Sequence, residues 1–435
     1  MWSSTTRVPP DDALLSYGGY VSIDVNEQHA RMTRDFGGDG GLSWFGFAAE
    51  QSAGGRVRWR TDAARVEARV LYRRACNERC AIDLDHKSCY QNGRCHAECE
   101  AVLLVDGQRV DAACHASGGQ YSGEQLCRTT SETSQVRDYE LIFPWAAAID
   151  FLGLNLLSST VGTAELVAAE PWLSSSRLRY VAYGDSITHG WCGRGPSYAE
   201  ALAAHVGYER MEPINMGIQG LSTGKGLMGR HGDAVGALQP DLITIMLGIN
   251  DVLGGGRSEA ELALIGRRVG QITAETRRAA PGAVIAVITP IACAWLDVEP
   301  LRAEIRQQVL PRPSGEARLP INDPRLLLVE GGALLPQPLL LEGLHPTSEG
   351  KQAIAAALYA ELGFSPIHRH AYTCTYTYAY TYTKVRRAGV SPIHRHAYTC
   401  TYTYAYIHKG TPSWASHPCG TRSRAASPIA SRSPG

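Results

Sequence analysis

The sequence predicts an α/β protein with two folded parts and a low-complexity tail. Segments typical of strands dominate residues 14–172, whereas strand-like and helix-like segments alternate over residues 173–363. From residue 364 onward the composition changes and a short segment is repeated. A chain of 435 residues is long for one domain, so we expect two domains, 14–172 and 173–363, followed by a tail over 364–435.

The alternating segments of residues 173–363 predict a parallel sheet that helices cover on both faces. Short apolar runs indicate buried strands, and longer runs with one apolar face indicate helices. The predicted strands are 178–183, 242–246, 284–289 and 326–329. The predicted helices are 198–206, a second that starts with the pattern 259–272 and ends near Pro281-Gly282, 301–309 and 347–362.

The first part of the chain predicts an all-β sandwich. Several of its segments alternate apolar and polar residues, as half-buried antiparallel strands do. Asp106-Gly107 is a typical hairpin turn between two of them. The predicted strands are 55–61, 65–72, 101–105 and 139–144, and two packed sheets would bury their apolar faces.

A cysteine-rich insertion over 76–127 interrupts the predicted sandwich. Its spacing favours disulfides over a zinc site made with His86 or His96, because it lacks a CxxC pair. We expect at least two bridges, and an odd number of cysteines leaves one free or paired with a distant residue such as Cys192. The cluster favours secretion, although the first ten residues lack the apolar core of a signal peptide. The seven cysteines are Cys76, Cys80, Cys89, Cys95, Cys99, Cys114 and Cys127.

The tail and the overall composition restrict the possible partners. Residues 365–380 recur without change as residues 391–406, and the remainder is rich in Ser, Pro and Arg, so we expect disorder. Lys and Arg total 42, as do Asp and Glu, and this zero net charge argues against nucleic acid or an anionic membrane as the main partner. No apolar run reaches the 18 residues or so that a transmembrane helix needs.

A serine motif carries the clearest indication of chemistry. Gly184-Asp185-Ser186-Ile187-Thr188 follows the predicted strand 178–183, and a helical pattern follows it. A serine there lies at the carboxyl edge of a parallel sheet, where α/β proteins bind ligands. The alternative is a simple N-cap serine in a tight turn. A serine nucleophile also needs a base, a group that orients the base, and donors for the oxyanion.

Four further residues at the ends of predicted strands can supply those groups. His345 is the candidate base, and Glu342 lies three residues before it, where a carboxylate can hold the ring N–H. Asn250 and Gly220 follow two other strand-like runs, on the same edge of the sheet. Taken singly, His345, Asn250 and Gly220 each have a simpler interpretation as a turn or helix-entry residue. We expect His189, only three residues after Ser186, to have a structural or substrate-edge role.

These stretches resemble the sequence blocks of the SGNH hydrolases, the superfamily that includes the GDSL esterases and lipases. Residues 184–188 match the first block, the surroundings of Gly220 the second, and residues 248–251 the third. The fifth block of the family has Asp-x-x-His-Pro, whereas this chain has Glu342-Gly343-Leu344-His345-Pro346. Glutamate thus replaces the expected aspartate. Because some members of the family work with a Ser-His dyad, both a triad and a dyad are open.

The resemblance implies a flavodoxin-like three-layer catalytic domain and ester hydrolysis through an acyl-enzyme. Ser186 would be the nucleophile, His345 the base and Glu342 its orienter. Gly220, Asn250 and the Ser186 N–H would form the oxyanion hole. No metal or organic cofactor is implied. A sandwich, here jelly-roll-like, ahead of such a domain is similar to the layout of family-two carbohydrate esterases, which implies a short acyl group on a carbohydrate as substrate. The alternative is a carbohydrate-binding or adhesion protein with a degenerate esterase domain.

Overall fold

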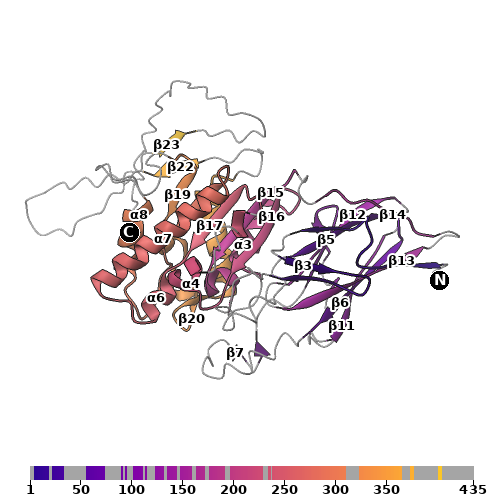
Figure 1. The fold of residues 1–435 in the computed structure, drawn as a ribbon, viewed down its shortest axis with the longest axis horizontal. Helices are drawn as coiled ribbons and strands as arrows, with labels where there is room; N and C mark the ends of the chain where they lie inside the picture. Colours follow the sequence, from indigo (N-terminus) through magenta and orange to yellow (C-terminus); the bar gives the residue numbers. More distant parts are fainter. Residues whose placement is uncertain are drawn as a thin grey trace, which may run out of the picture. The chain divides into compact units, whose positions relative to one another are not determined.

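In the computed structural model, residues Met1–Glu361 form one compact unit and Leu362–Gly435 form a second. Strands dominate the first part of the larger unit, and helices and strands alternate in the second part (Figure 1). The structure describes residues 4–18, 22–33, 55–73, 90–91, 94–95, 101–110, 113–114, 123–131, 135–144, 147–158, 163–171, 176–191, 196–228, 234–236, 238–309, 323–364, 373–376 and 400–403.

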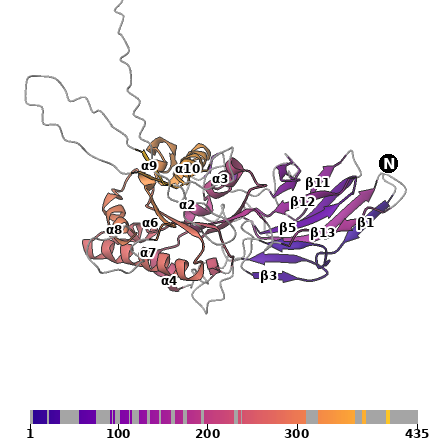
Figure 2. The same cartoon turned by 90° about the horizontal axis from the view of Figure 1, so that it is seen from above.

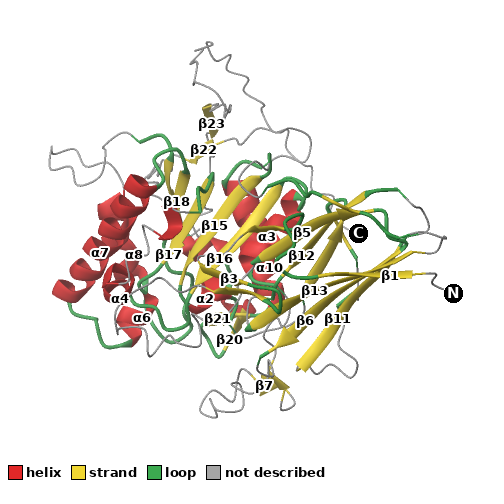
Figure 3. Ribbon diagram, turned by 45° about the vertical axis from the view of Figure 1, so that its right-hand side comes forward, coloured by secondary structure: helices red, strands yellow, loops and turns green. Residues whose placement is uncertain are grey.

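Two antiparallel sheets form the predicted sandwich (Figure 3). The first has the order β11-β6-β13-β4-β3, with β1 paired to β13, and the second has the order β10-β9-β12-β5-β14, with β2 paired to β5. The first sheet contains β1 (Ser4–Val8), β3 (Ser22–Val25), β4 (Ala30–Thr33), β6 (Arg65–Tyr72), β11 (Gly123–Thr130) and β13 (Ile149–Ser158). The second contains β2 (Ser16–Gly18), β5 (Arg56–Thr61), β9 (Val102–Val105), β10 (Gln108–Arg109), β12 (Arg137–Ile142) and β14 (Leu166–Val167).

The two sheets share one apolar core. Strand β6 shows why, because buried and half-buried residues alternate along its whole length, as the sequence predicts. Trp59 of β5 stacks on Tyr139 of β12, with ring centroids 5.6 Å apart, and Phe143 lies against Phe151 of the other sheet. The predicted hairpin is present between β9 and β10, and Asp106 and Gly107 both have positive φ there.

One bridge of the predicted disulfide framework lies within the described residues. Cys114 is bonded to Cys127, which is buried in β11. A short hairpin of β7 (Tyr90–Gln91) and β8 (Arg94–Cys95) lies in the same cysteine-rich region. The side chains of the other five cysteines, and Cys192, lie outside the described residues, so their pairing stays a prediction.

The second part of the larger unit is built around a five-stranded parallel sheet with the order β16-β15-β17-β18-β19. This is the flavodoxin-like order, in which the chain adds strands first on one side of β15 and then on the other. The strands are β15 (Leu178–Gly184), β16 (Met211–Gly217), β17 (Leu242–Met246), β18 (Val284–Ile288) and β19 (Leu326–Val329). Every residue of β16 and β17 is buried, as expected for strands covered on both faces.

Helices cover both faces of this sheet and confirm the three-layer prediction. Helices α3 (Tyr198–Val206) and α10 (Ser348–Glu361) pack together on one face, and α7 (Glu259–Ala279) and α8 (Glu299–Val309) pack on the other (Figure 2). Short helices follow the strands or lie beside the larger ones: α2 (Ser186–His189), α4 (Thr223–Met228), α6 (Ile249–Leu253), α9 (Gly331–Leu334) and a 3-10 turn (Gln337–Leu339).

Helix α7 ends at Ala279, close to the end that the sequence predicts near Pro281-Gly282. It begins with a complete capping box, in which Ser258 and Glu261 exchange hydrogen bonds. It continues until Ala280 precedes Pro281, a position that disfavours helical backbone. No helix of the described residues is both long enough and apolar enough to span a membrane.

In the second unit the two copies of the repeat each contribute one short strand. Strand β22 (Thr373–Tyr376) pairs antiparallel with β23 (Cys400–Thr403), so that Thr373 lies opposite Thr403. Most of the tail that the sequence predicts to be disordered lies outside the described residues. The division of the larger unit into domains 14–172 and 173–363 stays a prediction.

A buried cluster of charges joins the sandwich to the parallel sheet. Glu140 of β12 forms ion pairs with Arg56, Arg58 and Arg177, with distances of 3.0, 3.2 and 2.6 Å between the guanidinium nitrogens and the carboxylate oxygens. Glu212 of β16 is fully buried and pairs with Arg58 and Arg177. Charges out of water are stable only when they are paired in this way, so the cluster fixes how the two sheets adjoin.

We expect Glu140→Gln to lower the free energy of unfolding by about 3 kcal/mol, because it removes one of the two carboxylates that balance the arginines of this buried cluster. Urea unfolding of both proteins measures the difference. Glu124→Gln is the matched control: it breaks an ion pair with Arg69 whose carboxylate is 45% exposed, and it should cost less than about 1 kcal/mol. Equal effects of the two substitutions would contradict this role for Glu140.

Candidate active site

Ser186 is the first residue of α2, directly after the central strand β15. Asp185 is the N-cap, and its Oδ1 accepts a hydrogen bond of 2.9 Å from the Ile187 N–H. Gly184 is required here because a Cβ would lie only 2.6 Å from the Met246 carbonyl oxygen of β17. The serine is thereby held at the carboxyl edge of the sheet, where its side chain is 5% exposed.

His345 reaches Ser186 from the far end of the domain. Its Nε2 lies 2.9 Å from Ser186 Oγ, although 159 residues separate the two in sequence. His345 lies in the short strand β21 (His345–Pro346), which pairs with β20 (Leu340–Leu341) just before α10 begins. With Nε2 accepting from the serine hydroxyl, the imidazole proton is on Nδ1.

Glu342 contacts the other nitrogen of the same ring, so that His345 Nδ1 hydrogen-bonds Glu342 Oε1. The glutamate lies in the turn between β20 and β21, which the Leu344 N–H closes by donating to the Leu341 carbonyl. Glu342 has φ +38° and Gly343 has φ +79°. A left-handed backbone at a glutamate is uncommon. From this backbone the Glu342 side chain reaches the His345 ring.

Asn250 and Gly220 lie on neighbouring segments of the same edge. Asn250 belongs to α6, which begins after β17 at Gly248, a residue with φ +113°. Its Nδ2 donates to the Leu221 carbonyl at 3.2 Å, which ties α6 to the turn that contains Gly220. Gly220 has φ +71°, a conformation that glycine adopts without cost. The second N–H of the Asn250 amide is left for another acceptor.

Two further contacts brace the site, and the sequence analysis did not identify either. Asp251 accepts hydrogen bonds from the Thr223 N–H and hydroxyl, at 2.9 and 2.7 Å, which fixes α6 to α4. Lys351 of α10 is buried, and its Nζ donates to the Gly190 carbonyl at the end of α2 at 2.7 Å. The position of Asp251, next to Asn250, could have indicated its role from the sequence. No sequence feature indicates that Lys351, six residues after His345, is buried and contacts α2.

His189 is buried and stacks on Trp191, with ring centroids 6.3 Å apart. Its structural or substrate-edge role stays a prediction. No group of three His, Cys, Asp or Glu side chains within the described ranges is arranged as a metal site.

Asp185, directly before Ser186 in the chain, is an ionisable group that is completely buried. Its complete burial raises the pKa to about 7, and the nearby Asp251 charge adds to this, while the Ile187 N–H opposes it. Its Oδ2 has no hydrogen-bond partner among the described residues. A protonated carboxyl directly beside the serine is therefore accessible near neutral pH.

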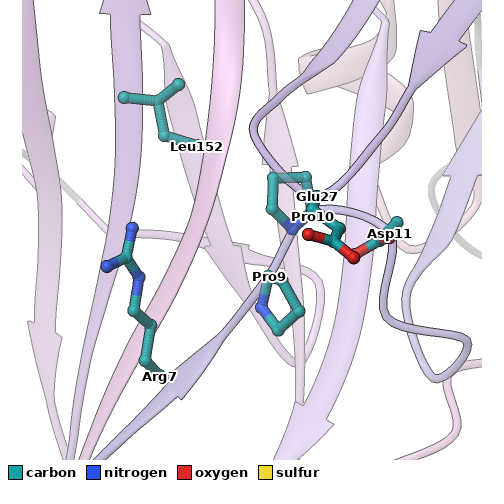
Figure 4. Close-up of a pocket in the computed structure, with 6 residues that line it drawn as sticks. All are labelled: Arg7, Pro9, Pro10, Asp11, Glu27 and Leu152. Carbon is teal, nitrogen blue, oxygen red and sulfur yellow. The ribbon is translucent and has the colours of Figure 1, made fainter.

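A separate hollow of about 360 Å³ lies on the sandwich (Figure 4). Arg7, Pro9, Pro10, Asp11, Glu27 and Leu152 line it. It contains none of the residues that meet at Ser186, so it is distinct from the candidate active site.

Comparison with known proteins agrees with this geometry. Residues 182–353 match the model of the GDSL-like lipase/acylhydrolase family. No curated protein sequence matches the chain.

Several solved structures are similar over most of the chain. A salicylyl-acyltransferase, SsfX3, from a tetracycline biosynthetic pathway is 16% identical, with a TM-score of 0.59 over 85% of this chain and 100% of that one. A GDSL-like lipase from Bacteroides ovatus, whose function is only inferred, is 16% identical, with a TM-score of 0.57 over 83% and 97%. A family-two carbohydrate esterase from Cellvibrio japonicus is 14% identical, with a TM-score of 0.52 over 83% and 97%. At such identities the likeness shows a common fold.

Asp185→Asn tests the consequence of the buried carboxyl for stability. Because the pKa of Asp185 is raised from 3.8 to about 7 in the folded protein, folding retains a proton that the unfolded chain loses between these values. The contribution of Asp185 to the free energy of unfolding therefore falls as the pH rises from about 4 to about 7. The free energy of unfolding of the variant, relative to the original protein, should rise over this window and level off above it.

Urea unfolding between pH 4 and 8 measures this difference. Asp297→Asn is the matched control, since the Asp297 carboxylate is also bonded to a backbone N–H two residues later but is exposed. A pH-independent difference for Asp185→Asn would contradict the raised pKa.

Proposed function

Since the chain is an SGNH hydrolase of the GDSL type, a serine hydrolase that acts on ester bonds, we propose that Ser186, His345 and Glu342 carry out the reaction. The observation that carries this proposal is the position of His345, whose ring contacts Ser186 Oγ with one nitrogen and Glu342 with the other. This arrangement has the geometry of a nucleophile, a general base and an orienting carboxylate.

In the first step Ser186 Oγ attacks the ester carbonyl carbon while its proton passes to His345 Nε2. A bond forms between Oγ and the acyl carbon, and the carbonyl oxygen becomes an oxyanion. Glu342 stabilises the imidazolium and keeps the ring in the required tautomer. When the tetrahedral intermediate collapses, His345 returns the proton to the departing alcohol, and the acyl group stays on Ser186.

The oxyanion would be held by the backbone N–H groups of Ser186 and Gly220 and by the Asn250 amide. The Asn250 Nδ2 already donates one N–H to the Leu221 carbonyl, which fixes the direction of the other. Donors that are held in place before the reaction stabilise the developing charge without reorganisation. In the second step His345 takes a proton from a water molecule that attacks the acyl carbon. As the bond between Ser186 Oγ and the acyl carbon breaks, His345 returns this proton to Oγ, and the acid is released.

For the substrate we propose a short acyl ester of a carbohydrate, such as an acetylated sugar. The support is the combined layout of an antiparallel sandwich followed by the catalytic sheet, which this chain shares with a family-two carbohydrate esterase over 83% of its length. The alternative of a binding protein with a degenerate esterase domain is less well supported, because every group of the proposed triad is in contact. Acetylated xylo-oligosaccharides, compared with nitrophenyl esters of two to eight carbons, would distinguish a sugar acetate from a longer acyl ester.

Ser186→Ala should lower kcat for nitrophenyl acetate by on the order of 10⁴-fold or more, since it removes the group that carries the acyl intermediate. Initial rates of nitrophenolate release measure this loss, and thermal melting confirms that the variant folds. Ser258→Ala, at an exposed helix start, is the matched serine control and should leave kcat unchanged. A folded Ser186→Ala protein with most of its activity would exclude Ser186 as nucleophile.

Glu342→Gln should lower kcat far more than Glu342→Asp, because only the acid stabilises the imidazolium that forms at His345. The glutamine variant keeps the length of the side chain and loses its charge, so the pair separates charge from reach. Steady-state kinetics with nitrophenyl acetate provide the comparison. Near-normal turnover in both variants would mean that the site works as a Ser-His dyad.

A further inference from the structure

The turn that carries Glu342 lies against a loop that begins at the end of β18. This loop is anchored at its base, where Arg302 of α8 donates from Nε to the Pro290 carbonyl at 2.8 Å. Ile291 and Cys293 are buried, whereas Ala294 and Trp295 reach the surface. The loop is therefore a fixed element whose tip projects beside the active site.

The tip of this loop holds the backbone of the Glu342 turn through two hydrogen bonds. The Ala294 N–H donates to the Gly343 carbonyl at 2.8 Å, and Trp295 Nε1 donates to the Glu342 carbonyl at 2.9 Å. The indole ring also lies directly on Gly343, because a Cβ at that glycine would be 2.7 Å from Trp295 Nε1. Both carbonyls of the left-handed segment thus have a donor from the same loop.

The need for such support follows from the backbone of Glu342. Its φ of +38° is sparsely populated for a residue with a long side chain, and it persists only where surrounding contacts impose it. The same backbone orientation places Oε1 on His345 Nδ1. If the Glu342 carbonyl were released, the turn could relax and the carboxylate would move away from the ring.

We propose that Trp295 is a positioning residue, which holds the Glu342 turn in its left-handed conformation so that the carboxylate meets His345. This inference rests on the proposed function of Glu342 and assigns a role to a residue whose Nε1–H donates to the Glu342 backbone. It also explains a tryptophan at a position that is 55% exposed, since the Nε1 edge of the ring is the part that is used.

The test is a double-mutant cycle between Trp295→Phe and Glu342→Gln. Phenylalanine keeps a ring over Gly343 and removes only the Nε1–H donor. We expect Trp295→Phe to lower kcat about fivefold, the effect of one hydrogen bond, with KM unchanged. In the Glu342→Gln background the same substitution should change kcat by less than about twofold, because the carboxylate that Trp295 positions is already absent.

Two results would overturn the proposal. An equal loss of kcat in both backgrounds would show that Trp295 does not act through Glu342. A change confined to KM would show that the exposed ring contacts the substrate instead. Thermal melting of each variant separates both results from a loss of folding.

A second readout does not depend on catalysis. In the resting protein the His345 Nδ1 proton, hydrogen-bonded to Glu342, should give a downfield NMR signal that Glu342→Gln removes. Trp295→Phe should shift or broaden this signal, and an unchanged signal would contradict the proposal. Because no substrate is present, this measurement is informative even if the protein does not hydrolyse the esters tested.

Discussion

The site depends on one geometric constraint, that the parallel strands all end at the same edge of the sheet. Gly184 of β15 lies opposite Met246 of β17, so the segments that follow these strands begin side by side. Ser186 and Asn250 follow Gly184 and Met246 by only a few residues, so both lie near this pair of strand ends. The strand order also reverses at β15, which opens a place for a ligand between the two segments.

His345 and Glu342 reach this edge by a different route. They lie in a small hairpin of β20 and β21, outside the main sheet, and α10 then packs on α3. Lys351 of α10 donates to the last carbonyl of α2, so the helix after the histidine is tied to the helix of the serine. The hydrogen bond between Ser186 and His345 is thus supported by the hairpin that carries His345 and by the contact of Lys351 with the end of α2.

Contacts from another part of the domain hold the turn that carries Glu342. Aspartate is among the residues that adopt left-handed backbone most readily, and glutamate is not. In this chain the turn is nevertheless left-handed at Glu342, and a loop from β18 supplies donors to both of its carbonyls. The Glu342 carboxylate therefore faces the imidazole from a turn whose backbone is held by a distant loop.

The sequence by itself determined the elements and the chemistry of individual residues. Apolar runs predicted the strands, helical periodicity predicted the helices, and the Gly184-Asp185-Ser186 motif indicated a nucleophile, because each of these signals is local. The tertiary structure decided which groups meet. The donors from Ala294 and Trp295 to the Glu342 turn join segments that are distant in sequence, and so does the charge cluster of Arg56, Glu140 and Glu212. No local pattern encodes such contacts, since they arise only when separate strands and loops are packed together.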